Sequence, residues 1–342
     1  MDNRVGVAVI GAGYWGRKFI GEYLAAEQKG KLALLKVCDP SIAALGALLI
    51  TKGTAKVPRE RLTQNLIDVL DDPEISAVHI ATPNHTHFEV AKKALEAGKN
   101  VLIEKPMTIK PSESYELVDL ARANCLTIQV GHIYRFNSVV RLAREILERE
   151  ELGKLFYVRV QWTDQAFYPD RDIIFDLGPH PIDILNQLLG TWPQQSSGMT
   201  RGYRGDRGEV AYIISEFPND VFAHIELSWL HPNKNREVTI VGSTQTLVVD
   251  CLKQTMFRTV GSKREQIPTS ANNTMEAEID YFVDSIIRGD ASYESGLIGA
   301  QTVEVLDSIR SSMWDRPLPV IEKVDREAVK SVIDVEDGEP AQ

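Results

Sequence analysis

The N-terminal stretch VGVAVIGAGYWG, residues 5–16, constrains the fold more than any other part of the chain. An apolar run ends in the glycines Gly11, Gly13 and Gly16, and a helical pattern follows. In a dinucleotide-binding βαβ unit the first glycine permits a tight turn, the second lets the backbone approach a pyrophosphate, and the third lets helix and strand pack closely. The helix N-terminus offers free N–H groups to the phosphates. This stretch therefore predicts dinucleotide binding.

An acidic residue follows at the spacing that this fingerprint requires. The second predicted strand, residues 32–38, ends at Asp39. A carboxylate there suits the free 2′-hydroxyl of an adenosine ribose and repels a 2′-phosphate, and the next residues, Pro40 and Ser41, supply no arginine for that phosphate. The sequence therefore predicts NAD rather than NADP. Asp39 can also cap the following helix, and the two roles are compatible.

Strands and helices alternate over residues 1–130, which predicts a doubly wound parallel sheet of the Rossmann type. Ligands of such sheets bind beyond the carboxyl ends of the strands. The polar segments that fall at those ends are 11–16, 39, 82–87, 104–106 and 132–137. The cofactor-binding residues predicted from this placement are Gly11, Gly13, Tyr14, Trp15, Gly16, Asp39, Thr82, Pro83, Asn84, His87, Glu104 and Lys105.

The pattern changes after residue 131. A helix is expected over 139–149, followed by strands whose polarity alternates and whose connections carry turn-forming residues. These strands are expected at 155–162, 210–217, 221–229, 236–241 and 246–250, and two amphipathic helices at 274–288 and 297–313. We predict an α+β domain over 131–324 with a mostly antiparallel open sheet, for substrate binding and oligomerisation. A charged C-terminal extension, 325–342, follows.

Composition narrows the range of functions. The chain has 342 residues and a formal net charge of −10, which argues against general binding to nucleic acid or to an anionic membrane. No apolar run approaches the ~18 residues of a membrane span, and the first strand begins without a signal peptide. The cysteines Cys38, Cys125 and Cys251 form no disulfide framework, and the first two are expected in the core. The expected location is the cytoplasm.

Four motifs in order resemble those of the Gfo/Idh/MocA oxidoreductases, the relatives of glucose-fructose oxidoreductase and inositol dehydrogenase. VLIEKP, residues 101–106, resembles the family's EKP signature, and ATPNHTH, 81–87, its preceding strand-end motif. GHIYRFN, 131–137, is similar to its domain-junction segment, and DLGPH, 176–180, to its DxxxH motif. The resemblance implies that Lys105, Asp176 and His180 form the catalytic group. It also implies a homodimer or homotetramer that pairs through the open sheet.

The chemistry of these residues agrees with that resemblance. Alcohol oxidation by NAD needs a base for the hydroxyl proton and a group that stabilises the developing charge on oxygen. An ammonium at Lys105 can orient a substrate hydroxyl and lower its pKa. His180 is the best candidate for general acid–base catalysis, because imidazole titrates near neutral pH. Its flanking prolines predict a turn that leads into the start of a helix, where Asp183 can interact with the dipole.

Other interpretations of these residues stay open. Lys105 can form a surface ion pair with Glu104, and Asp176 can be a helix cap, contact the hydroxyl or orient His180. Tyr134, Arg135 and Asn137 are predicted to contact substrate, although Arg135 can equally form a structural salt bridge. His79, inside a strand, is expected to be a core histidine. No metal is expected, because the acidic and histidine side chains lack a recognisable ligand spacing; those considered are His85, His87, Asp176, His180 and Asp183.

The substrate can be narrowed only by analogy. The family acts mostly on sugars, cyclitols and their nucleotide derivatives. GYWG, residues 13–16, and the compact segment 172–180 look like the branch that oxidises nucleotide sugars at C3, which implies UDP-N-acetylglucosamine or its uronic acid. Inositol or a free sugar is the alternative. A non-enzymatic NAD(P)-binding sensor, or a reductase of imines or linear tetrapyrroles, is also open, but Lys105, Asp176 and His180 favour a dehydrogenase.

Overall fold

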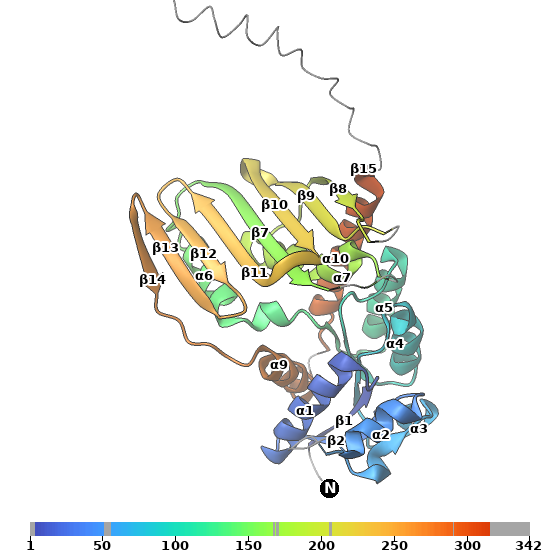
Figure 1. Cartoon of the computed structure of the whole chain (residues 1–342). Coiled ribbons are helices and arrows are strands. Elements are labelled where there is room, and N and C mark those ends of the chain that lie inside the picture. The colour runs from blue at the N-terminus through green and yellow to red at the C-terminus, as the bar shows by residue number, and fades with distance from the viewer. Residues whose placement is uncertain are drawn as a thin grey trace, which may run out of the picture.

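The described residues form two β-sheets, one from the N-terminal part of the chain and one from the C-terminal part (Figure 1). The computed structural model describes residues 4–50, 56–166, 168, 171–204, 207–289 and 291–314. The charged extension predicted at 325–342 lies outside these residues. Within them, no helix has the length and apolar character needed to cross a membrane.

The first sheet has six parallel strands in the order β3-β2-β1-β4-β5-β6, which confirms the predicted doubly wound domain. Its central strands β1 and β4 are buried along their whole length and are apolar except for His79, because helices cover both faces of the sheet. The strands are β1 (Val5–Ile10), β2 (Leu32–Cys38), β3 (Leu62–Thr63), β4 (Ala77–Ile80), β5 (Asn100–Ile103) and β6 (Ile128–Val130). The helices are α1 (Tyr14–Gln28), α2 (Ile42–Ile50), α3 (Ile67–Leu70), α4 (His87–Glu96) and α5 (Pro111–Ala123).

The second sheet is mostly antiparallel and open, as predicted, with the order β14-β13-β12-β11-β7-β10-β9-β8-β15. Its strands are β7 (Leu155–Gln165), β8 (Gln195–Arg201), β9 (Val210–Phe217), β10 (Val221–Ser228), β11 (Leu230–Gly242), β12 (Thr246–Asp250), β13 (Thr255–Val260), β14 (Lys263–Ile267) and β15 (Met313–Trp314). β8, β13 and β14 were not expected from the sequence. β8 reads QSSGMTR, which has too few apolar residues for a strand signal, and its pairing with β9 supplies what local preference lacks.

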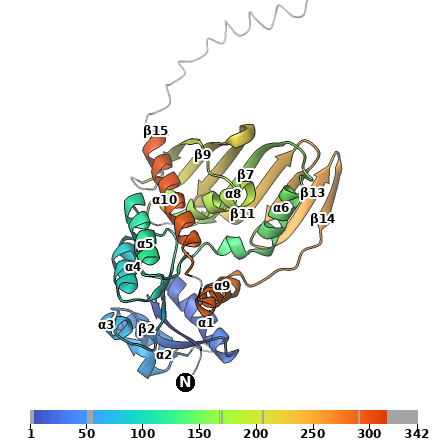
Figure 2. The ribbon, with the colours of Figure 1, turned by 180° about the vertical axis from the view of Figure 1, so that it is seen from behind.

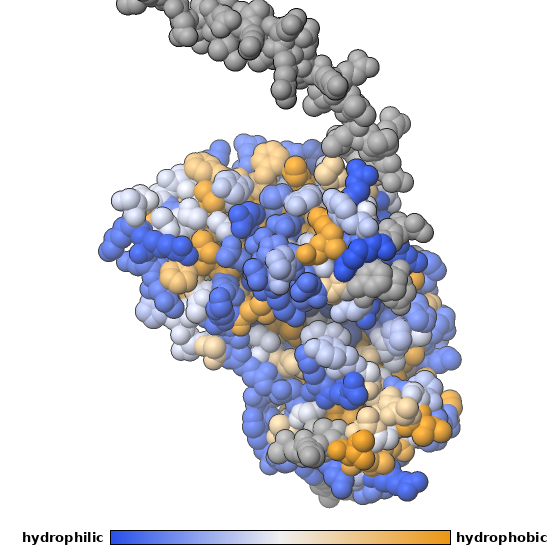
Figure 3. Space-filling model, in the orientation of Figure 1, coloured by the Kyte–Doolittle hydropathy of each residue, from blue (hydrophilic) through white to orange (hydrophobic). Residues whose placement is uncertain are grey.

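Helices cover one face of this sheet (Figure 2). They are α6 (Ser138–Glu148), α7 (Ile173–Leu177), α8 (Pro179–Leu189) and α10 (Glu294–Ser312). In the part of the chain that the structure describes, no helix lies over the opposite face (Figure 1). Figure 3 shows apolar residues scattered among polar ones on this side of the molecule. The exposed apolar side chains on these strands include Tyr157, Tyr212, Ile214 and Phe222.

The two C-terminal helices pack against the first domain, as their amphipathic pattern suggested. α9 (Thr274–Arg288) contacts α1 and buries Phe282 with Phe19. α10 lies on α5 and β6, where a Cβ on Gly296 would be 2.6 Å from Ile128 and one on Gly299 would be 2.4 Å from Val130. These helices therefore fix the parallel sheet against the second sheet.

One core expectation is wrong. Cys38 is buried, but Cys125 is exposed. Cys125 follows the end of α5 and has φ +54°, so it belongs to the turn out of the helix rather than to the strand that the apolar context suggested.

Candidate active site

The glycine loop after β1 has the shape that a dinucleotide requires. Gly11 has φ +105°, and a Cβ there would lie 2.5 Å from the Ala81 carbonyl oxygen. A Cβ on Gly16 would lie 2.0 Å from the Gly11 carbonyl oxygen, so only glycine lets α1 begin this close to the loop. A Cβ on Gly13 would meet no protein atom within 4 Å. The space beside Gly13 is therefore open to a pyrophosphate at the N-terminus of α1.

Asp39 lies at the end of β2, next to this loop. One carboxylate oxygen accepts a hydrogen bond from the Ala12 N–H at 2.7 Å, and the other accepts from the Ser41 N–H at 2.8 Å. The side chain thus closes the glycine loop and precedes α2. Each oxygen keeps a lone pair for a ribose hydroxyl, and the carboxylate disfavours a 2′-phosphate. These residues fit NAD.

The loop that follows β4 extends the same edge. Residues 82–84 are half-buried or exposed there. His87 is fully buried, and its Nδ1 and Nε2 lie 2.9 Å from the carbonyl oxygens of Pro106 and Thr82. His87 therefore ties this loop to the segment after Lys105, and its ring does not face the open edge.

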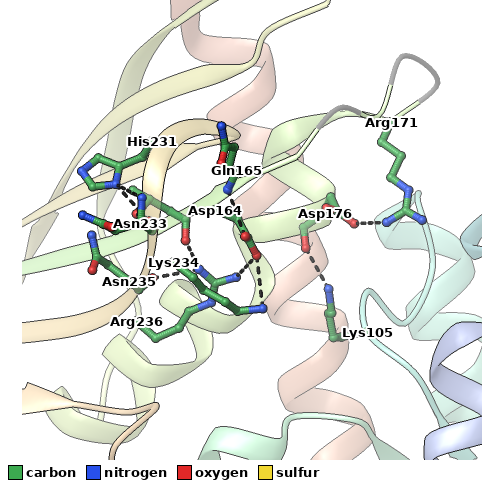
Figure 4. Close-up of polar contacts among 11 residues, drawn as sticks. Lys105, Asp164, Gln165, Arg171, Asp176, His231, Asn233, Lys234, Asn235 and Arg236 are labelled. Carbon is green, nitrogen blue, oxygen red and sulfur yellow. Dashed lines mark hydrogen bonds and ion pairs between the residues drawn. The ribbon is translucent and has the colours of Figure 1, made fainter.

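Lys105 extends from the carboxyl end of β5 toward the second sheet. Its Nζ donates a hydrogen bond to the backbone carbonyl of Asp176 at 2.8 Å (Figure 4). The neighbouring Glu104 is buried against Gly131, with one oxygen 3.5 Å from Nε2 of His79. His79 itself is fully buried in β4, as expected of a core histidine. Lys105 thus links the two halves of the molecule instead of extending from the surface toward Glu104.

Asp176 and His180 lie four residues apart on two consecutive helices. His180 is in the first turn of α8, as its flanking prolines predicted. Asp176 lies inside α7 and caps neither helix, so the helix-cap alternative for Asp176 is wrong. Asp172 explains the difference, because its Oδ1 accepts a hydrogen bond from the Ile174 N–H at 2.8 Å and caps a short helix there.

His180 is held by aromatic rings. Its ring centroid lies 4.9 Å from that of Tyr134 and 5.9 Å from that of Trp162. Its Nδ1 is buried and has no hydrogen-bond partner among the described residues. Burial, reinforced by the positive charge of Lys105, lowers the pKa of His180 well below its usual value. The imidazole is therefore neutral near pH 7 and can accept a proton.

Lys105 and Asp176 complete the polar face of the site. Burial lowers the pKa of Lys105, and the carboxylate of Asp176 opposes that effect. The Asp176 carboxylate also pairs with Arg171, with Oδ1 and Nη1 3.0 Å apart (Figure 4). A lysine ammonium of lowered pKa is a strong hydrogen-bond donor, which suits an oxygen that gains negative charge.

The three junction residues predicted to contact substrate have different surroundings. Tyr134 contacts His180 as described above. Arg135 donates hydrogen bonds to the buried Asp183 and, at 2.7 Å, to Asn186, so it forms the structural salt bridge that the sequence left open. Asn137 is buried, and its Oδ1 caps α6. Asp183, in the N-terminal half of α8, pairs with Arg135.

A further group of charged residues, which the motifs did not indicate, lies at the ends of β7 and β11. We call Asp164, Lys234 and Arg236 the β11 cluster (Figure 4). Asp164 Oδ2 lies 3.2 Å from Lys234 Nζ and 3.4 Å from Arg236 Nη2. The nearby Lys18 lowers the pKa of Tyr14; Lys234 adds to that effect in smaller measure, and Asp164 opposes it.

A signal for Arg236 is present in the sequence. Val238 and Ile240 face the core, and strand alternation places Arg236 in the same inward row. A charged residue in an inward row has to be paired or functional.

Together, the nucleotide-binding edge and the half-buried Lys105, Asp176 and His180 define an NAD-dependent oxidoreductase acting on CH–OH groups. Across the described ranges, no group of three or more histidine, cysteine, aspartate or glutamate side chains is arranged to hold a metal ion.

Comparison with known proteins identifies the family. Residues 5–132 match the model of the GFO/IDH/MocA oxidoreductase family, NAD-binding Rossmann fold, and residues 140–248 match a GFO/IDH/MocA C-terminal domain. The chain belongs to the GFO/IDH/MocA oxidoreductase family.

Relatives with several activities match the chain. The uncharacterized oxidoreductase YdgJ of Escherichia coli is 31% identical over 201 residues, which is 56% of this chain and 55% of YdgJ. The scyllo-inositol 2-dehydrogenase (NAD(+)) of Bacillus subtilis is 26% identical over 89% of this chain and 93% of its own length. The solved UDP-N-acetylglucosamine 3-dehydrogenase of Acidithiobacillus ferrooxidans superposes with a TM-score of 0.76 at 26% identity, covering 90% of this chain and 97% of that one.

Proposed function

We propose that this protein oxidises the C3 hydroxyl of a UDP-N-acetylhexosamine, or of its uronic acid, with NAD as hydride acceptor. The observation that carries the proposal is the meeting of Lys105, Asp176 and His180 where the parallel sheet faces the second sheet. The likeness to the UDP-N-acetylglucosamine 3-dehydrogenase, which extends over 90% of this chain, supports the choice of substrate.

The chain's own residues account for the proton chemistry. The Lys105 ammonium donates a hydrogen bond to the substrate oxygen and stabilises the charge that develops on it. The neutral His180 imidazole accepts the hydroxyl proton, and in the reverse direction the imidazolium returns it. Asp176 supplies the backbone carbonyl that holds Lys105 in place. When bound, NAD accepts the hydride.

The charge around the site favours an anionic substrate. The whole chain carries a net charge of −10, yet Arg171 and Lys234 stand half-exposed beside the site, and the buried Arg236 lies behind them. The acidic partners Asp164 and Asp176 offset only part of this positive charge. A local cationic field in an acidic protein attracts a diphosphate or a uronate carboxylate.

The first experiment measures formation of reduced nicotinamide by its absorbance, with NAD and one sugar at a time. UDP-N-acetylglucosamine and its uronic acid are expected to give turnover, and inositol and free hexoses are not. Lys105→Met should lower kcat by about 10²-fold or more and leave the Kd for NADH nearly unchanged. Lys110→Met is the matched control, because Lys110 is exposed five residues away and pairs with Glu113.

A second experiment identifies the carbon. UDP-N-acetylglucosamine deuterated at C3 should show a primary isotope effect, and substrate deuterated at C4 should not. Turnover with inositol or free hexoses alone would move the protein to the alternative, which the scyllo-inositol 2-dehydrogenase relative supports. Tight NAD binding without turnover of any of these sugars would favour a sensor or regulator. Loss of NADH binding together with turnover in Lys105→Met would contradict the assigned role of Lys105.

We propose a homodimer or homotetramer that forms through the helix-free face of the second sheet, in the cytoplasm. Phe222 lies opposite Tyr157 on the neighbouring strand, and Tyr212 and Ile214 lie one strand further along. Each of these four side chains is at least two-fifths exposed, and they lie on regular strands among polar side chains such as His224 and Glu226. A second copy of this chain presents the same surface, which suits a two-fold interface.

Light scattering on Ile214→Lys and Phe222→Lys tests this interface. Each variant is expected to lower the molar mass toward that of one chain, while far-UV circular dichroism stays unchanged. Ile287→Lys is the control, because Ile287 is equally exposed but lies on α9. A parent protein of one-chain mass, or variants that keep the parent mass, would contradict the proposal.

A further inference from the structure

A buried arginine lies behind the catalytic histidine. Arg236 is 7% exposed, and its guanidinium carbon lies 5.0 Å from the centroid of the Trp162 ring. Trp162 in turn contacts His180, and Tyr134 contacts both rings, with its centroid 4.8 Å from that of Trp162. Arg236 is thus one ring away from the imidazole that accepts the proton.

The partners of Arg236 satisfy its N–H groups but do not cancel its charge. Nη1 donates to the backbone carbonyls of Thr163 and, at 2.8 Å, of Asn235. The only carboxylate among its described partners is Asp164, which lies 3.4 Å from Nη2 and is shared with Lys234. Backbone carbonyls carry no net charge, and one carboxylate shared by two cations neutralises neither completely. The β11 cluster therefore keeps a net positive charge beside Trp162.

We propose that Arg236 is a positioning residue that keeps His180 neutral and fixes its ring against Tyr134 and Trp162. The proposal goes beyond the proposed substrate, because it concerns the proton acceptor that any CH–OH substrate of this site would use. A charged imidazole would lie between Lys105 and a buried guanidinium, and repulsion from both disfavours it.

The other charged groups near His180 do not replace this effect. Asp183, one turn further along α8, forms an ion pair with Arg135, and its Oδ1 lies 3.2 Å from Nδ1 of His132. Asp176 forms an ion pair with Arg171. Burial lowers the pKa of both Lys105 and His132. It also lowers the pKa of Arg236, but from the much higher starting value of a guanidinium, which makes Arg236 the most persistent cation of the group.

The test is an NMR titration of His180 in the full-length protein labelled with ¹⁵N-histidine. The chain has seven histidines, and the His180 resonance is the one missing from His180→Gln. Arg236→Gln should raise the midpoint of the His180 titration by about one pH unit, because a nearby cation is removed. Arg236→Lys keeps the charge and should restore the parent midpoint. The exposed His224, on the other face of the sheet, is the internal reference.

Two further variants make the test independent of folding defects in Arg236→Gln. Asp164→Asn removes the shared carboxylate and leaves the cation, so it should move the His180 midpoint in the opposite direction, to lower pH. Arg159→Gln is the matched control, because Arg159 pairs with Glu237 on the exposed face of the same sheet and should leave the midpoint unchanged. An unmoved midpoint in Arg236→Gln, an upward or absent shift in Asp164→Asn, or an equal shift in Arg159→Gln would overturn the proposal.

Discussion

Three glycine-to-alanine substitutions separate folding from cofactor binding within one helix. Gly16→Ala would place a methyl group 2.0 Å from the Gly11 carbonyl oxygen, and Gly13→Ala would place one where no protein atom lies within 4 Å. Gly21 lies in the middle of α1 and also has open space around its Cβ position. The same chemical change should therefore have three different results.

The expected magnitudes follow from these distances. A contact of 2.0 Å with a backbone atom can be relieved only by a shift of about 1 Å in loop or helix, which should cost about 3 kcal/mol of unfolding free energy. Gly13 has φ −69°, a value that alanine adopts, so Gly13→Ala should cost about 1 kcal/mol or less. The new methyl group would instead meet the pyrophosphate of the cofactor. The affinity for NADH should therefore fall about tenfold or more, which corresponds to about 1.4 kcal/mol of binding free energy. Gly21→Ala should stabilise the protein by about 0.5–1 kcal/mol.

Urea unfolding of the cofactor-free protein measures the first quantity, and titration of protein fluorescence with NADH measures the second. Gly13→Ala should have nearly the stability of the parent in urea unfolding and a lower affinity for NADH in the titration. Gly21→Ala should be more stable than the parent and bind NADH as the parent does. Parent-like NADH affinity in Gly13→Ala would refute the placement of the pyrophosphate, and a Gly16→Ala protein as stable as Gly21→Ala would refute the packing argument.

Two other substitutions probe buried acids. Glu278 in α9 is fully buried, both of its oxygens lack a hydrogen-bond partner among the described residues, and burial raises its pKa well above the usual value. The parent protein should therefore lose stability as pH rises above about 4.5, the usual pKa of a glutamate. Glu278→Gln should remove that loss and raise the unfolding free energy at pH 7, measured in urea, by about 1–3 kcal/mol. A variant less stable than the parent at pH 7 would count against this. Asp183→Asn leaves Arg135 without its carboxylate and should lower the unfolding free energy by about 3–5 kcal/mol in the same assay. Asp307→Asn, at the exposed pair with Arg310, should lower it by about 1 kcal/mol or less. Equal losses in the two variants would contradict the role given to burial.

Local sequence determined much of the first domain. The glycine turn, the apolar strands and the stop signals act over a few residues, so β1, β2 and α4 follow from their own segments. The motifs at the strand ends also predicted which residues would meet, because the carboxyl ends of parallel strands lie along one edge. Lys105 was found in this way, whereas His180 was found through its DxxxH motif and lies on α8, outside the parallel sheet.

The second sheet was harder to predict because its strands depend on their neighbours. β8 and β14 are polar segments that become strands by pairing with β9 and β13. Preference for strands is weak and depends on context, and no window of a few residues contains the partner.

What the sequence determined by itself is the class of reaction, since a glycine fingerprint, an EKP lysine and a DxxxH histidine carry chemistry in short segments. What only the tertiary structure decided is the surroundings of those groups. Arg135 pairs with Asp183 across 48 residues, and Arg236 reaches Trp162 across the pairing of β11 with β7. The second of these contacts carries our proposal that Arg236 keeps His180 neutral and positions its ring. Both contacts arise from the packing of two sheets against shared helices, which no local pattern encodes.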